Sequence, residues 1–129
     1  MNIVFIGAGN LATHLSQALQ QAGYAIRQVY SRTEASARTL ALQLSCDYTT
    51  TLEEVHTDAD VYIFSVKDQV LATLVNHLCP RLSDKVCLHT AGSVPLSVFE
   101  SAAQRYGVLY PMQTFSINRL WIKVILVEE

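Results

Sequence analysis

The chain has 129 residues, of which half are hydrophobic and 16% are charged, and its formal net charge is -2. This length suits a single domain over residues 1–129 that buries roughly two thirds of its unfolded surface. No apolar run approaches the ~18 residues needed to cross a bilayer, and no basic cluster offers a footprint for nucleic acid. We therefore expect neither a membrane nor nucleic acid as a partner.

The number and spacing of the cysteines indicate the cellular compartment of the protein. The three cysteines, Cys46, Cys79 and Cys87, form no CxxC pair, and the N-terminus lacks the basic region and cleavage site of a signal peptide. An odd number of cysteines without secretory features is typical of reduced thiols, so we predict a cytoplasmic protein with three packing cysteines. The histidines show no metal-ligand spacing, and no metal is expected.

Apolar runs and amphipathic segments alternate along the chain. The run at 2–6 ends at Gly7, and the next apolar positions have helical spacing up to Gly23, a natural helix-ending residue. This order of strand and helix is repeated to the end of the sequence. Strands are predicted over 2–6, 24–30, 46–49, 60–66, 86–89, 107–110 and 121–128, and helices over 11–22, from SRTEAS to 44, near 52–55, over 68–78 and over 95–104.

The alternation predicts an α/β fold, a doubly wound and mostly parallel sheet with helices on both faces. The last strand, 121–128, is apolar. Because an unpaired strand edge is an aggregation hazard, we expect this edge to pair with a second copy of the chain, as a homodimer, or with another partner.

The stretch VFIGAGNLA, residues 4–12, follows the first strand and opens the first helix. Gly7 permits a tight turn, Gly9 lets the backbone approach a pyrophosphate, and Ala12 is small enough for close packing of helix on strand. The first amides of the helix would then face the phosphates. The alternative is a glycine turn with a packing role alone. The cofactor-binding residues predicted here are Gly7, Ala8, Gly9, Asn10 and Leu11.

The end of the second strand selects among nucleotides. An acidic residue at this place would bind the ribose hydroxyls of NAD, but the sequence has Ser31, Arg32 and Thr33. Arg32 is placed to bind a ribose 2′-phosphate, with the two hydroxyls as further donors, which predicts NADP(H) as the cofactor. The alternative is an exposed arginine beside a helix cap. A methyltransferase is disfavoured for the same reason, since it too would place an acid here.

The motifs VFIGAGNLA, VYSRTEASA, FSVKD, HTAGS and YPMQTF occur in this order. With them the chain resembles the N-terminal domain of a bacterial family of NADP oxidoreductases, and more distantly it is similar to pyrroline-5-carboxylate reductases and deazaflavin-dependent NADP oxidoreductases. The resemblance implies a Rossmann-type fold with NADP(H) bound across the carboxyl ends of the strands. Such proteins continue into a helical domain that dimerises and closes the substrate pocket. Nothing follows Glu129 here, so we expect that domain to be absent and the chain to be truncated.

The remaining candidates follow the later strands, where ligands of open α/β sheets bind. By resemblance, Ser65, Val66 and Lys67 line the ribose on the nicotinamide side, and Thr90, Ala91 and Gly92 lie near the nicotinamide itself. The alternative for Lys67 is a surface charge with no ligand. His89 is a candidate proton donor or, alternatively, a structural hydrogen bonder. Ser93 is placed to bind the carboxamide or substrate, or to cap a helix. The catalytic candidates are His89, Ser93, Tyr110 and Gln113, of which the last two would touch a small-molecule substrate.

The sequence thus predicts the NADP(H)-binding domain of an oxidoreductase that transfers hydride to or from a small imine or carbonyl compound. The rival prediction is a non-catalytic NADP-binding module, or a fragment that needs a partner domain.

Overall fold

The computed structural model describes residues 1–91, 94–100, 102–113 and 120–128. Its strands are β1 (Asn2–Ile6), β2 (Ala25–Tyr30), β3 (Asp47–Thr49), β4 (Val61–Phe64), β5 (Val86–His89), β6 (Arg105–Gln113) and β7 (Leu120–Glu128). The α-helices are α1 (Asn10–Gln21), α2 (Glu34–Leu44) and α3 (Asp68–Leu78), and the 3-10 turns are η1 (Leu52–Glu54), η2 (Cys79–Arg81) and η3 (Leu96–Phe99).

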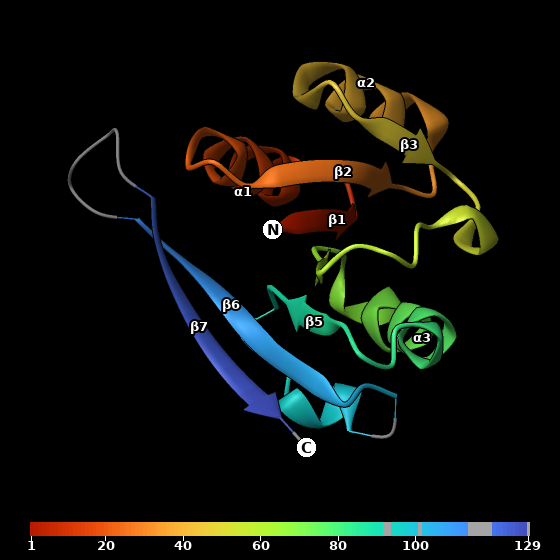
Figure 1. Ribbon diagram of the computed structural model, residues 1–129, viewed down its shortest axis with the longest axis vertical. Coiled ribbons are helices and arrows are strands. Elements are labelled where there is room, and N and C mark those ends of the chain that lie inside the picture. Colours follow the sequence, from red (N-terminus) through yellow and green to blue (C-terminus); the bar gives the residue numbers. More distant parts are fainter. Residues whose placement is uncertain (92–93, 101, 114–119, 129) are drawn as a thin grey trace.

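The strands form one sheet in the order β3-β2-β1-β4-β5-β6-β7 (Figure 1). The first six strands are parallel, and β7 runs antiparallel to β6 at the edge. The chain moves outward from β1 to β3 and then returns to place β4 on the other side of β1, so the strand order reverses between β1 and β4. In open α/β sheets such a reversal creates the crevice where ligands bind.

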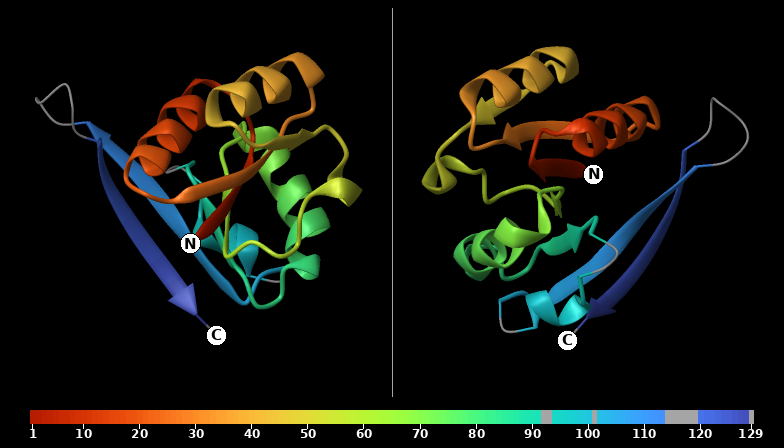
Figure 2. Two further views of the ribbon diagram at one scale, coloured as in Figure 1. Left: turned by 45° about the horizontal axis from the view of Figure 1, so that its top comes forward. Right: turned by 180° about the vertical axis from the view of Figure 1, so that it is seen from behind.

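The core has two layers because successive residues of a strand face opposite sides of the sheet. Val4 and Ile6 of β1 pack with α3, whereas Ile3 and Phe5 pack with α1 and α2. Figure 2 shows helices on both faces of the sheet. The described residues contain no helix long and apolar enough to span a membrane. The predicted α/β fold of Rossmann type is confirmed.

Two predicted elements differ most from the structure in length. The helix expected over 95–104 is only the 3-10 turn η3, after which the carbonyl of Phe99 accepts the amides of both Ala102 and Ala103. The ring of Phe99 is fully buried and anchors this turn. The sixth strand was expected over 107–110, but β6 extends to Gln113 because β7 pairs with it along its whole length.

The pairing of β7 corrects two further expectations. Tyr110 was placed at the end of the sixth strand and Gln113 beyond it, whereas both lie within the β6–β7 pairing, opposite Lys123 and Leu120 of β7. One edge of the last strand is therefore paired inside the chain (Figure 1). The expectation of pairing with another copy of the chain now concerns only the outer edge of β7.

Candidate functional site

Four residues form the floor of a cavity at the carboxyl edge of the sheet. Each is the first residue after a strand, and each donates its backbone amide to the strand beside it. The amide of Gly7 bonds to Tyr30 (2.7 Å), that of Ser31 to Thr49 (3.2 Å), that of Ser65 to Ile6 (2.8 Å) and that of Thr90 to Phe64 (3.2 Å). The turns are therefore extensions of the sheet, and they hold the loop residues that follow them.

The cavity above this floor has a volume of about 660 Å³, within the size range of pockets for cofactors and other small ligands. Its walls come from the glycine turn, the end of β2, the β4–α3 turn and the end of β5. The predicted cofactor residues that line it are Gly7, Ala8, Gly9, Asn10, Leu11, Ser31, Arg32, Thr33, Ser65, Val66, Lys67, Thr90 and Ala91. The fold thus brings together, around one cavity, residues from four separate segments of the sequence.

The glycine turn has the geometry that a nucleotide loop needs. Gly7 has φ +122°, and a β-carbon there would lie 2.0 Å from the carbonyl oxygen of Ser65. At Gly9 a β-carbon would meet nothing within 4 Å, so the backbone faces open space. Ala12 is fully buried, which brings α1 close to the sheet. Asn10 and Leu11, in the first turn of α1, line the cavity, and the unpaired amides of a helix N-terminus favour an anion.

The end of β2 presents polar groups at the cavity. Arg32 is exposed there, and the hydroxyl of Ser31 accepts the amide of Thr33 at 3.3 Å. Thr33 occupies the N-cap position of α2, but its side chain makes no capping hydrogen bond. The neighbouring Tyr30 also lines the cavity; burial raises its pKa, which the charge of Arg32 opposes, so its phenol stays protonated at neutral pH.

Five lining residues were missed by the sequence analysis. Tyr30 was assigned only to a strand, and Asp68, Val70, Thr73 and Leu74 only to a helix. Positions 70, 73 and 74 have the spacing of one helix face, a pattern that ordinarily indicates core packing. In the structure Val70 is 38% exposed and offers apolar surface to the cavity.

His89 lies behind the cavity wall and is not among the residues that line it. Its side chain is fully buried and its ring stacks on Phe99, with 5.5 Å between centroids. The ring atom Nδ1 accepts the amide of Ala91 at 3.1 Å. Burial lowers the pKa of His89, and the carboxylate of Asp68 opposes this shift.

The side chains of the remaining candidates lie outside what the structure describes. Gly92 and Ser93 lie outside the described residues. The structure describes the backbone of Tyr110 and Gln113 within β6, but not their side chains. Their predicted contacts with substrate stay predictions.

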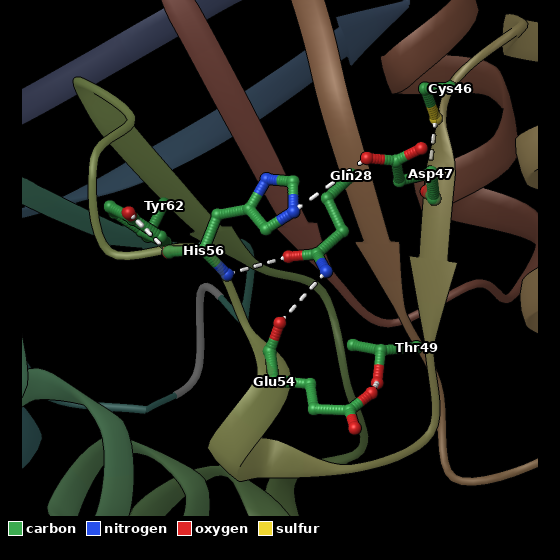
Figure 3. A network of polar contacts seen from close by, with 7 residues as sticks. All are labelled: Gln28, Cys46, Asp47, Thr49, Glu54, His56 and Tyr62. Carbon is green, nitrogen blue, oxygen red and sulfur yellow. Dashed lines mark hydrogen bonds and ion pairs between the residues drawn. The ribbon is translucent and has the colours of Figure 1, made fainter.

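A polar network supports the β2 side of the site (Figure 3). Gln28 is 2% exposed, and its amide donates to the carbonyl of Glu54 and accepts the backbone amide of His56. The hydroxyl of Tyr62 on β4 accepts the amide of Ala59 and donates to the carbonyl of His56. These bonds fix the segment between β3 and β4 against the sheet.

Cys79 and Cys87 are fully buried, with their sulfur atoms 3.4 Å apart, as expected for packing residues, whereas Cys46 is half-buried. In the part of the chain that the structure describes, no three His, Cys, Asp or Glu side chains gather as a metal site would require.

Together, the glycine turn at a strand-order reversal and the cavity above it define a Rossmann-type domain that binds a nicotinamide dinucleotide, NAD(P). Residues 2–91 match the family of NADP oxidoreductases described as coenzyme F420-dependent, and the chain belongs to this family.

A solved structure agrees with this assignment. A Bacteroides fragilis protein, assigned as an NADP oxidoreductase, is 45% identical to this chain and superposes on it with a TM-score of 0.88. The match covers 97% of this chain and 50% of the Bacteroides chain.

Curated relatives are also oxidoreductases. Pyrroline-5-carboxylate reductase from Vibrio alginolyticus is 33% identical over 78 residues, which are 59% of this chain and 29% of that protein. The enzyme of the same name from Pseudomonas aeruginosa is 28% identical over 102 residues, 77% of this chain and 37% of that protein. The chain therefore matches about a third of the length of these curated relatives. The predicted resemblance is confirmed.

Proposed function

We propose that this domain binds NADP(H) as the cofactor domain of an oxidoreductase that transfers hydride to or from a small imine or carbonyl compound. The observation that carries the proposal is the position of Arg32, which lines the same cavity as the glycine turn. A guanidinium matches the geometry and charge of a phosphate, and no carboxylate follows β2 directly to bind an unphosphorylated ribose.

The lining residues fit such a dinucleotide. Gly9 leaves open space beside the free amides of α1, which suits the close approach of a pyrophosphate. Arg32 and Lys67 bring two positive charges to the cavity, and Asp68 is the one carboxylate among the described residues that line it. A phosphate-bearing ligand is therefore favoured there on charge as well as shape.

Each wall would hold one part of the cofactor, which itself supplies the hydride chemistry. The glycine turn and α1 would hold the pyrophosphate, and the residues after β2 the 2′-phosphate. Ser65, Val66 and Lys67 would contact the ribose on the nicotinamide side, and Thr90, Ala91 and Gly92 would lie along the nicotinamide. Ser93, Tyr110 and Gln113 are the proposed contacts to the substrate.

The test is a calorimetric titration of the chain with NADPH and NADH, repeated on Arg32→Ala. We expect wild type to bind NADPH at least about tenfold more tightly than NADH. The variant should lose this preference, while its affinity for NADH stays within about twofold of that of wild type. Arg38→Ala is the matched control, because Arg38 is exposed on α2 and does not line the cavity. Equal affinity of wild type for both dinucleotides, or binding of neither, would refute the proposal.

A second candidate is a binding module that turns over no substrate on its own. The observation that favours it is the length of the relatives, since this chain matches 50% of the Bacteroides chain. NADPH oxidation against a panel of cyclic imines and small ketones separates the two, because a module binds NADPH without consuming it.

A homodimer through the outer edge of β7 is a further proposal, which sedimentation at several concentrations would test.

A further inference from the structure

His89 is held in one orientation by its surroundings. It is the last residue of β5, it is fully buried, and its ring stacks on Phe99 of η3 with an interplanar angle of 29°. Phe64 and Tyr106 belong to the same core cluster as Phe99. The imidazole therefore has a fixed position between the sheet and the η3 turn.

One hydrogen bond connects this ring to the cavity. The backbone amide of Ala91 donates to Nδ1 of His89 at 3.1 Å, so Nδ1 carries no hydrogen and the neutral ring is protonated on Nε2. Nε2 is buried and has no hydrogen-bond partner among the described residues. The bond to Ala91 is thus the polar contact that the described structure gives this side chain.

That bond shapes a wall of the cavity. Thr90 and Ala91 both line it. The amide of Thr90 is held by the carbonyl of Phe64 at 3.2 Å, and the carbonyl of Ala91 accepts the amide of Val94 at 2.9 Å. The bond to His89 satisfies the amide of Ala91, which would otherwise be free to turn away. Without Nδ1 of His89 as an acceptor, the amide of Ala91 is no longer held. The turn after β5 is then restrained only by the hydrogen bonds on either side, at the amide of Thr90 and the carbonyl of Ala91.

We propose that His89 is a positioning residue, which acts through the amide of Ala91 to hold the Thr90–Ala91 wall in the shape that receives the nicotinamide half of the dinucleotide. This inference rests on the function proposed above and assigns His89 a role other than proton donor. The accepting role is incompatible with an imidazolium at this place, because an imidazolium carries hydrogen on both nitrogens and its Nδ1 could not accept the amide of Ala91.

The surroundings keep the accepting form at neutral pH. The groups that the structure sets against His89 are the ring of Phe99 from η3, which stacks on the imidazole, and the carboxylate of Asp68 at the start of α3, whose charge acts on it. Burial lowers the pKa of His89 from its ordinary value, and Asp68 offsets only part of this shift. The wall should therefore lose its support only as the pH falls through this lowered pKa.

The experiment compares His89→Asn with His89→Phe in the full chain. The amide oxygen of Asn can take the place of Nδ1 as an acceptor, whereas Phe fills the space without one. The ligands are NADPH and 2′,5′-ADP, which lacks the nicotinamide half. We expect His89→Phe to lower the affinity for NADPH by about tenfold and the affinity for 2′,5′-ADP by less than about twofold. The affinities of His89→Asn for both ligands should stay within about threefold of those of wild type.

Other results would count against the inference. Unchanged NADPH affinity in His89→Phe overturns it, as does an equal loss for both ligands, which would indicate a general loss of structure. If wild type binds 2′,5′-ADP but His89→Asn loses NADPH turnover with unchanged NADPH affinity, His89 is a proton donor and the inference is wrong. Failure of wild type to bind either ligand is a different result, because it refutes the proposed function itself.

A measurement on the unmodified chain avoids dependence on variant folding. In a pH series of amide NMR spectra, the Ala91 resonance should shift with the titration of the His89 ring, because protonation removes its acceptor. The amide of Val94, which bonds to a backbone carbonyl, is the internal reference. An Ala91 resonance that ignores the His89 titration overturns the inference.

Discussion

Gly7 and Ser65 approach so closely that a β-carbon on Gly7 would lie 2.0 Å from the carbonyl oxygen of Ser65. The contact joins the turns after β1 and β4, the two strands at which the strand order reverses. Gly7 also has φ +122°, a conformation that L-residues with side chains rarely adopt. The close approach of these two turns therefore requires glycine, whatever ligand the cavity takes.

Replacement of the two glycines separates structure from binding. Gly7→Ala should lower the free energy of unfolding by more than about 3 kcal/mol, because it adds backbone strain and a clash with a carbonyl that cannot move away. Gly9→Ala should fold normally, since a β-carbon there meets nothing within 4 Å, yet bind NADPH at least about tenfold more weakly. Urea unfolding and calorimetry measure the two effects. A stable Gly7→Ala variant would contradict the described turn.

The side chain of Gln28 should contribute measurably to stability. Gln28→Leu leaves the carbonyl of Glu54 and the amide of His56 without their partner in a site that is 2% exposed, so we expect a loss of about 1–3 kcal/mol. Gln17→Leu is the control, because Gln17 bonds to Gln43 on the exposed surface and its loss should cost less than about 0.5 kcal/mol. Equal effects of the two substitutions in urea unfolding would show that the buried network has no special weight.

Tyr62 should make stability depend on pH in the alkaline range. Burial raises its pKa to about 12 from an ordinary value of 10.0. Between these values the folded state keeps a proton that the unfolded state has lost, so the stabilisation is complete below pH 10 and falls as the pH rises toward 12. The loss should reach roughly 2–3 kcal/mol. Tyr62→Phe removes this contribution, and the difference between the two alkaline unfolding curves isolates it.

Thiol alkylation should distinguish the three cysteines. Cys79 and Cys87 are fully buried, and the hydrogen bond to Cys87 together with burial raises the pKa of Cys79, so neither should react with iodoacetamide in the folded protein at pH 8. Cys46 is half-buried with a pKa raised to about 11, and it should react slowly. Peptide mass spectrometry reports each site. Labelling of Cys79 or Cys87 at the rate of Cys46 would disagree with the packing described here.

The sequence was sufficient for the cavity floor and for the loops that wall it, but not for the face of α3 that borders the cavity. Gly7, Ser31 and Ser65 could be placed together because the carboxyl ends of parallel strands meet at one edge, and the position of a strand end is a local property. Val70, Thr73 and Leu74 could not, because their spacing is the same for a helix face that packs on a core and for one that borders a cavity.

The surroundings of His89 could not be predicted from the sequence either. They depend on Phe99, which is ten positions away in the chain and buried by a turn that sequence patterns predicted as a longer helix. The length of β6 depends on its pairing with β7, and such non-local pairing leaves no signal within the strand itself.

The four amides that tie the turns to the sheet have a consequence for affinity. Because Gly7, Ser31, Ser65 and Thr90 are bonded to neighbouring strands, the backbone beneath the ligand is already ordered before anything binds. Association then has little conformational entropy to overcome in this part of the chain, and contacts made there translate more fully into binding free energy. The hydrogen bonds of the sheet, rather than contacts with the ligand, therefore fix the shape of the cavity floor.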